Sequence, residues 1–138
     1  MGKRRKAREV VLQSLYEAEF SDLSCEEILK NQTVRRSSTP DTVEYARELL
    51  SMTLSNIDAL DEKIALVLKN WEMGRISLVD KNILRFALAE ILYFPQVPSK
   101  VIINEAIEIA HKYSSQDAGK FVNGILDRFI REFRGEIV

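Results

Sequence analysis

The sequence predicts an all-α protein. Apolar residues recur at helical spacing almost throughout the chain, and no alternating strand pattern of useful length is present. Five glycines and three prolines in 138 residues leave long stretches free of helix breakers. The hydrophobic content of 46% and charged content of 30% are those of an ordinary globular chain. We expect a compact bundle of about six to seven helices.

The length fits a single domain spanning residues 1–138, with enough buried surface for a core that needs no disulfide. Cys25 is the only cysteine, so no internal disulfide can form. No basic stretch precedes an apolar signal-like segment, and no apolar run approaches the ~18 residues of a membrane span. These features predict a soluble, cytoplasmic protein with no membrane segment.

The first helix is expected at about residues 3–20. Ala7, Val11 and Leu15 fall on one apolar stripe. At about 100° per residue, Arg5 and Tyr16 project within roughly 20° of each other on the flank of that stripe.

A capping box at Ser24–Glu27 then predicts a short helix with Ile28 and Leu29 inward. Residues 31–40 are expected to form the longest loop.

Thr39-Pro40 predicts a further helix start, because a proline at the first helical position loses no hydrogen bond. From there the apolar pattern continues to Trp71. We expect one long helix; the alternative is two helices with a break near residues 56–58. Gly74 is expected to end this segment.

The second half of the chain repeats the same signals. Residues 78–93 are apolar on nearly all sides, which is typical of a central buried helix. Pro95 and Pro98 should end it. The expected serine caps are Ser77 before this helix, Ser99 before a helix reaching about Tyr113, and Ser114-Ser115 before a last helix reaching about Phe133.

Charge is unevenly distributed. Of the 20 lysines and arginines, five lie in residues 1–8, so the other 130 residues carry 15 cations against all 21 carboxylates. An acidic body with a basic arm predicts one localised anion contact, for which nucleic acid is the usual ligand. The arm cations Lys3, Arg4, Arg5, Lys6 and Arg8 are candidate phosphate contacts. Tyr16, on the same edge as Arg5, is a candidate for stacking on bases. The alternatives are a solvated, frayed terminus and a tyrosine at the edge of the core.

Two glycines lie inside the predicted last helix, where each costs about 1 kcal/mol relative to alanine. Close packing of another helix on Gly119 and Gly124 is the simpler explanation, and approach of a ligand backbone is the other. Phe121 is a stacking site if exposed and an ordinary core residue if buried.

No catalytic signature is present: the sequence has no glycine-rich phosphate loop, paired metal motif or nucleophile elbow. Glu105 and Glu108 could suggest acid–base or metal chemistry, but His111 is the only histidine and lies off their face. A structural role, such as pairing of Glu105 with lysine or arginine, explains them better. We therefore predict a binding protein with no enzymatic activity, metal or cofactor.

Three segments resemble the NusB family. They are the opening, Arg4 to Glu9 followed by Gln13 to Tyr16, the central Arg75 to Arg85, and the C-terminal Val101 to Ala110 followed by Lys120 to Asp127. The resemblance spans almost the whole chain, and the C-terminal motif is the most specific part. The segment at about residues 22–40 does not match, so nothing is transferred to it.

The resemblance implies two packed helical subdomains and transcription antitermination. It implies binding to boxA, a single-stranded leader RNA, together with NusE, a small-subunit ribosomal protein. The complex would join RNA polymerase and promote read-through, notably in ribosomal RNA operons. Asp80 is the residue transferred to the NusE interface. The RNA-binding residues transferred by position are Arg4, Arg5, Lys6, Arg8, Tyr16, Asp117, Lys120 and Phe121.

Two alternatives remain at this stage. The chain could form a homodimer that masks its RNA surface. It could also be a relative of the helical module found at the N-terminus of certain RNA cytosine methyltransferases, acting without chemistry.

Overall fold

The computed structural model describes residues 2–68 and 75–138, with the backbone alone for residues 2 and 3. The described residues form seven α-helices and no strand. They are α1 (Gly2–Glu19), α2 (Cys25–Arg35), α3 (Pro40–Ser55), α4 (Ile57–Leu68), α5 (Leu78–Tyr93), α6 (Ser99–Tyr113) and α7 (Gln116–Arg134). The all-α prediction is confirmed.

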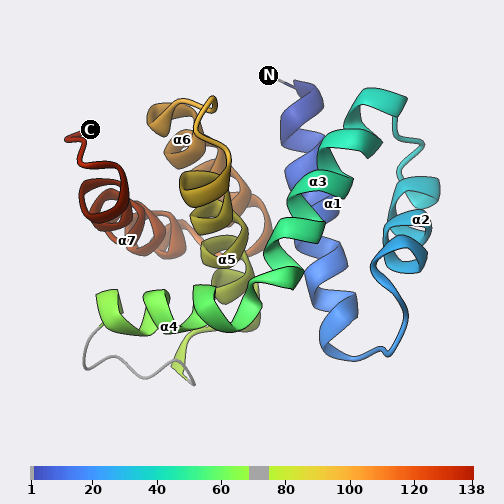
Figure 1. Cartoon of the computed structure of the whole chain (residues 1–138), viewed down its shortest axis with the longest axis horizontal. Helices are drawn as coiled ribbons and strands as arrows, with labels where there is room; N and C mark the ends of the chain where they lie inside the picture. Colours follow the sequence, from blue (N-terminus) through green and yellow to red (C-terminus); the bar gives the residue numbers. More distant parts are fainter. Residues whose placement is uncertain (1, 69–74) are drawn as a thin grey trace.

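Helix α5 is the central element of the bundle. In Figure 1, α1, α2 and α3 lie together on one side and α4, α6 and α7 on the other, with α5 between them. Helix α5 contacts α1 and α3 as well as α4, α6 and α7. Its residues from Asn82 to Ile91 are all buried, and Phe86 is fully enclosed. The prediction of a central buried helix is thus confirmed.

Local capping signals fix most helix starts. The hydroxyls of four N-cap residues accept a backbone N–H from the first turn of their helices, as the sequence predicted. These residues are Ser24, Thr39, Ser77 and Ser115. The prediction for Ser99 is wrong, because Pro98 is the N-cap of α6 and makes no side-chain cap.

The segment expected as one long helix is two helices, so the alternative interpretation is the correct one. Helix α3 ends at Ser55 and α4 begins at Ile57, with Asn56 between them at φ −118° and ψ 19°. The Asn56 amide donates to the Met52 carbonyl at 2.8 Å and so satisfies an end group of α3. The break lets α3 pack on α1 while α4 turns to pack on α5 and α7. The predicted extension to Trp71 and Gly74 lies outside the described residues.

The loop predicted at residues 31–40 is shorter than expected, because α2 continues to Arg35. The chain then leaves the helix through a Schellman turn. The Ser38 N–H donates to the Thr33 carbonyl at 3.2 Å, and the Ser37 N–H donates to the Val34 carbonyl at 3.3 Å. Ser37 has a φ of 49°, a left-handed conformation usually taken by glycine at this position. The turn fixes the position of Arg36, which follows α2 directly.

Arg134 closes the C-terminal end of α5. Its guanidinium donates to the carbonyls of Glu90, Ile91, Phe94 and Val97 at 2.7–3.2 Å. Helix ends leave carbonyls without intrahelical partners, and a planar guanidinium can satisfy several at once.

The two glycines of α7 have different surroundings. A Cβ on Gly119 would lie 2.1 Å from Nε2 of His111, so close packing explains this glycine. A Cβ on Gly124 would meet nothing within 4 Å, so packing does not explain that one.

Candidate nucleic-acid interface

Arg8 is an interior residue, which corrects its prediction as a direct phosphate contact. Its side chain is 1% exposed, and its guanidinium donates to both carboxylate oxygens of Glu90 at 2.8 Å. Tyr45 also donates its hydroxyl proton to Glu90. Burial and the neighbouring Glu90 carboxylate raise the pKa of Tyr45 well above its ordinary value. Arg8 therefore ties α1 to α5 inside the bundle.

Arg5 lies at the surface but is held by Glu105. The two groups form a bidentate pair at 2.8 and 2.7 Å, with the Arg5 side chain 42% exposed and that of Glu105 1% exposed. The hydrogen bonds from Arg5 outweigh burial and hold the pKa of Glu105 below its ordinary value. Glu105 thus has the structural pairing role that the sequence favoured, and Arg5 still offers part of its guanidinium to solvent.

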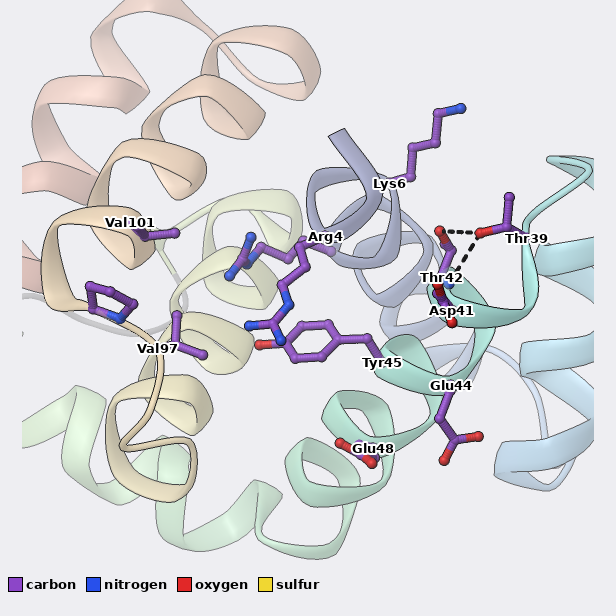
Figure 2. Close-up of a pocket in the computed structure, with 12 residues that line it drawn as sticks. Arg4, Lys6, Thr39, Asp41, Thr42, Glu44, Tyr45, Glu48, Val97 and Val101 are labelled. Atoms are coloured by element: carbon purple, nitrogen blue, oxygen red, sulfur yellow. Dashed lines mark hydrogen bonds between the residues drawn. The ribbon is translucent and has the colours of Figure 1, made fainter. Parts of the chain in front are cut away.

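Arg4 lies in a groove between α1, α3 and the start of α6 (Figure 2). Its guanidinium lies over the ring of Tyr45, 4.5 Å from the centroid. The groove encloses about 990 Å³, and its floor includes Val97 and Val101. Lys6 is exposed and points away from Tyr45 in Figure 2. Among the arm cations whose side chains the structure describes, Arg4 and Lys6 line the groove, Arg5 is held by Glu105 and Arg8 is buried on Glu90.

A second cationic cluster gathers around Glu9. The carboxylate of Glu9 accepts from Nη1 of Arg36 at 3.1 Å and from Nζ of Lys112 at 2.9 Å. Nη2 of Arg36 also donates to the hydroxyl of Tyr113 at 3.0 Å. The sequence analysis missed this cluster, because its members come from three distant segments and no spacing rule connects them.

Two aromatic rings are exposed at the end of α1. Tyr16 is 48% exposed and Phe20 is 69% exposed. Their ring centroids are 5.1 Å apart, with the planes tilted by 59°. Phe20 was also missed from the sequence; it lies one residue beyond α1, where its ring contacts that of Tyr16.

The start of α7 supplies the other predicted contacts. Asp117 and Lys120 are exposed, whereas Phe121 is partly buried and packs against the core. Phe121 is therefore neither a freely exposed ring nor a fully buried one.

The residue predicted at the NusE interface is Asp80. Asp80 is in the first turn of α5, half-buried, and its Oδ1 has no hydrogen-bond partner among the described residues. The side chain of Lys3 lies outside the described residues.

The described part of the chain holds no group of three or more histidine, cysteine or acidic residues arranged to bind a metal ion. Within the same residues, no helix is long and apolar enough to cross a membrane.

Comparisons with known proteins place this geometry in context. A family model described as the NusB family matches residues 5–131. The transcription antitermination protein NusB of Thermodesulfovibrio yellowstonii is 39% identical over 140 residues, covering 94% of this chain and 93% of that protein. The solved NusB of T. maritima is 38% identical with a TM-score of 0.85, covering 94% of this chain and 91% of that one.

A chain in the crystal structure of antitermination factors NusB and NusE in complex with double-stranded RNA has a TM-score of 0.87 and 25% identity. The match covers 96% of this chain and 99% of that one. This chain therefore belongs to the NusB family of transcription antitermination proteins.

Proposed function

We propose that this chain is a cytoplasmic transcription antitermination factor that binds boxA-type single-stranded leader RNA together with NusE. It helps RNA polymerase read through terminators, notably in ribosomal RNA operons, and acts by binding without catalysing a reaction. Family membership supports the antitermination role. The similar chain solved with NusE and double-stranded RNA supports NusE and RNA as partner classes.

The observation that carries the RNA-binding proposal is the exposed edge of α1. It presents a cation, Arg5, and an aromatic ring, Tyr16, on one side of α1, and the ring of Phe20, one residue beyond the end of the helix, lies 5.1 Å from that of Tyr16. Cations contact phosphates and aromatic rings stack on unpaired bases, and single-stranded RNA recognition combines the two. An edge of this composition therefore suits a single strand whose bases are free to stack.

The other contacts of the proposal follow from position. Lys3, Arg4 and Lys6 add positive charge near the start of α1. Asp117, Lys120 and Phe121 extend the surface onto the start of α7, where a carboxylate can accept from a base amino group. Arg8 contributes indirectly, by fixing α1 on the bundle.

The test is a fluorescence-anisotropy titration of a labelled boxA-type RNA across salt concentrations. Each phosphate contact on a single strand contributes about −0.7 to the slope of log K against log salt. Arg5→Ala should weaken binding and reduce the slope by about that amount. Arg47→Ala is the matched control, because Arg47 is also 42% exposed and also bound to carboxylates, those of Glu26 and Glu44.

Each outcome of this titration has a definite meaning. If Arg5→Ala and Arg47→Ala lower RNA affinity equally, the α1 edge is not the RNA site. A preference for the duplex form of the same sequence would contradict single-strand recognition. No binding by the wild-type chain, with or without NusE, would overturn the proposed function, and sedimentation of that sample would reveal a homodimer that masks the edge.

For NusE we propose a contact at the start of α5, around Asp80, because a carboxylate can pair with the cations of a basic ribosomal protein. Asp80→Asn should weaken the NusE complex in calorimetry while RNA binding by the chain alone stays unchanged. Asp58→Asn is the control, since Asp58 is likewise an acidic residue in the first turn of a helix. Equal NusE affinity for both variants would exclude Asp80 from the interface.

A further inference from the structure

Glu9, Arg36, Lys112 and Tyr113 form a network that the proposed function does not use. Glu9 comes from α1, Arg36 follows the end of α2, and Lys112 and Tyr113 are the last two residues of α6. The Glu9 side chain is 7% exposed, against 29% for Arg36 and 59% for Lys112. The acceptor is therefore on the inside, and both cations face outward from it.

The network retains positive charge and unused donors. One carboxylate is shared by two cations, so one positive charge is left over. The hydrogen bonds to Glu9 and Tyr113 use two of the five N–H donors of Arg36, and the bond to Glu9 uses one of the three on Lys112. The hydroxyl of Tyr113 accepts from Arg36 and can itself donate. The hydrogen bond that Lys112 donates to Glu9 raises the pKa of Lys112, so the ammonium stays charged.

The donors are also held in place. Arg36 is fixed by the Schellman turn that ends α2 and by its bonds to Glu9 and Tyr113. Lys112 is fixed by Glu9 at 2.9 Å. Ordering a long side chain on binding costs conformational entropy, and a side chain that is already ordered avoids part of that cost. The network is thus preorganised for an anion.

Its position lies between the two contacts proposed on α1. Glu9 follows Arg5 by four residues and precedes Tyr16 by seven, which is about 6 and 10 Å along a helix axis. Glu9 and Tyr16 are seven residues apart within α1 and so project within about 20° of each other. An RNA strand that touches both Arg5 and the rings therefore passes Lys112 and Arg36.

We propose that Arg36, Lys112 and Tyr113, positioned by Glu9, form a clamp for one backbone phosphate of the bound RNA. The inference rests on the proposed function and adds a site to it. A phosphate suits the geometry because it offers several acceptor oxygens to donors that converge from two segments. Glu9 acts as a positioning residue that does not touch the RNA.

The first test uses the full chain and the same labelled single-stranded RNA. Arg36→Ala and Lys112→Ala should each lower affinity about fivefold and each reduce the salt slope by about 0.7. Lys112→Arg should retain most of the affinity. The controls are Arg47→Ala and Lys100→Ala, the latter an exposed lysine at the other end of α6.

Neutral linkages in the RNA locate the phosphate. We would measure a series of RNAs that each carry one methylphosphonate linkage. At one position, the modification should weaken binding to the wild-type chain. The same modification should leave the affinity of the Lys112→Ala variant unchanged, because that variant has already lost the phosphate contact. If every linkage affects the wild-type and variant chains equally, no phosphate occupies the clamp. If RNA affinity is unchanged in both variants and NusE affinity falls, the surface serves the protein partner and the proposal is overturned.

Glu9→Gln separates positioning from simple charge. The substitution makes the surface more positive, so a diffuse electrostatic field predicts tighter RNA binding. A clamp predicts weaker binding, because both cations lose their anchor. Circular dichroism checks that the Glu9→Gln variant is folded. If it is not folded, the Arg36→Ala and Lys112→Ala variants still test the clamp. If the wild-type chain binds the RNA and none of these substitutions changes its affinity, the clamp is refuted but the proposed function is not. If the wild-type chain does not bind the RNA, the proposed function is refuted.

Discussion

Replacing Arg8 with methionine tests whether this arginine is part of the interior. The substitution keeps an apolar chain of similar length but removes the ion pair of the Glu90 carboxylate, which is 1% exposed and keeps the hydrogen bond from the Tyr45 hydroxyl. Breaking a buried ion pair from one side costs about 3–5 kcal/mol. Natural domains have only about 5–15 kcal/mol of stability, so the loss is a large part of the total. For a chain of this size it corresponds to a fall in melting temperature of roughly 10–20 °C.

A matched series separates the orphaned charge from lost packing. Arg47→Met removes an arginine whose ion pairs are exposed on both sides, and it should cost less than about 1 kcal/mol. The triple variant Arg8→Met, Glu90→Leu, Tyr45→Phe removes every polar member of the network. It should recover much of the stability that Arg8→Met loses, because no buried group is left without a partner.

The assay is equilibrium urea unfolding followed by circular dichroism, with RNA affinity measured on the same samples. We expect Arg8→Met to lower the urea midpoint of unfolding sharply. RNA affinity should fall only in proportion to the fraction of the variant that is unfolded. Wild-type stability in Arg8→Met together with a flattened salt slope would refute this reasoning. It would mean that Arg8 leaves Glu90 in solution and contacts phosphate directly.

Further substitutions probe the fold. Gly124→Ala should stabilise the chain by about 0.5–1 kcal/mol. Gly119→Ala should stabilise it only in combination with His111→Ala, because the new Cβ would meet the His111 ring. If the changes in unfolding free energy from the Gly119 and His111 substitutions are additive, that contact is contradicted. Ser37→Gly should raise the free energy of unfolding by about 0.5–1 kcal/mol, and with it the urea midpoint, because glycine adopts the left-handed conformation without the strain that serine has there. A lower midpoint would argue against the turn. The pKa of Glu105 is depressed, so its pairing stabilises the fold above the unfolded-state pKa near 4.5, and this contribution is lost as pH falls through the lower folded-state pKa. The stability gap between wild type and Glu105→Gln should therefore narrow on acidification from pH 7, and a constant gap would disprove the coupling.

The parts of the fold that the sequence predicted correctly depend on local interactions. An N-cap serine such as Ser24 or Ser115 acts on N–H groups within three residues, so its signal is complete in a short window. The break at Asn56 was not the preferred prediction, because the apolar spacing continues through it. What separates α3 from α4 is the different surface on which each packs, and that is a tertiary property.

The same division explains the candidate site. In the sequence, Arg5 and Arg8 are equivalent members of one basic run. In the structure, Arg5 lies at the surface on Glu105 and Arg8 lies in the interior on Glu90, and both glutamates are far along the chain. The Glu9 network combines three distant segments, so no spacing rule could indicate it. By contrast, the shared edge of Arg5 and Tyr16 follows from helix geometry alone.

The arrangement of Arg134 has a consequence for synthesis on the ribosome. The carbonyls that it binds, from Glu90 to Val97, are made about 40 residues before it. Until Arg134 leaves the exit tunnel, the end of the central helix lacks these donors and α7 cannot cover α5. Folding from the N-terminus can therefore assemble α1–α3 early, but it cannot complete the bundle. We expect nascent chains arrested before Arg134 emerges to be cleaved readily by protease near the end of α5, and chains arrested after it to resist. The last helix thus decides when the newly made protein becomes protected.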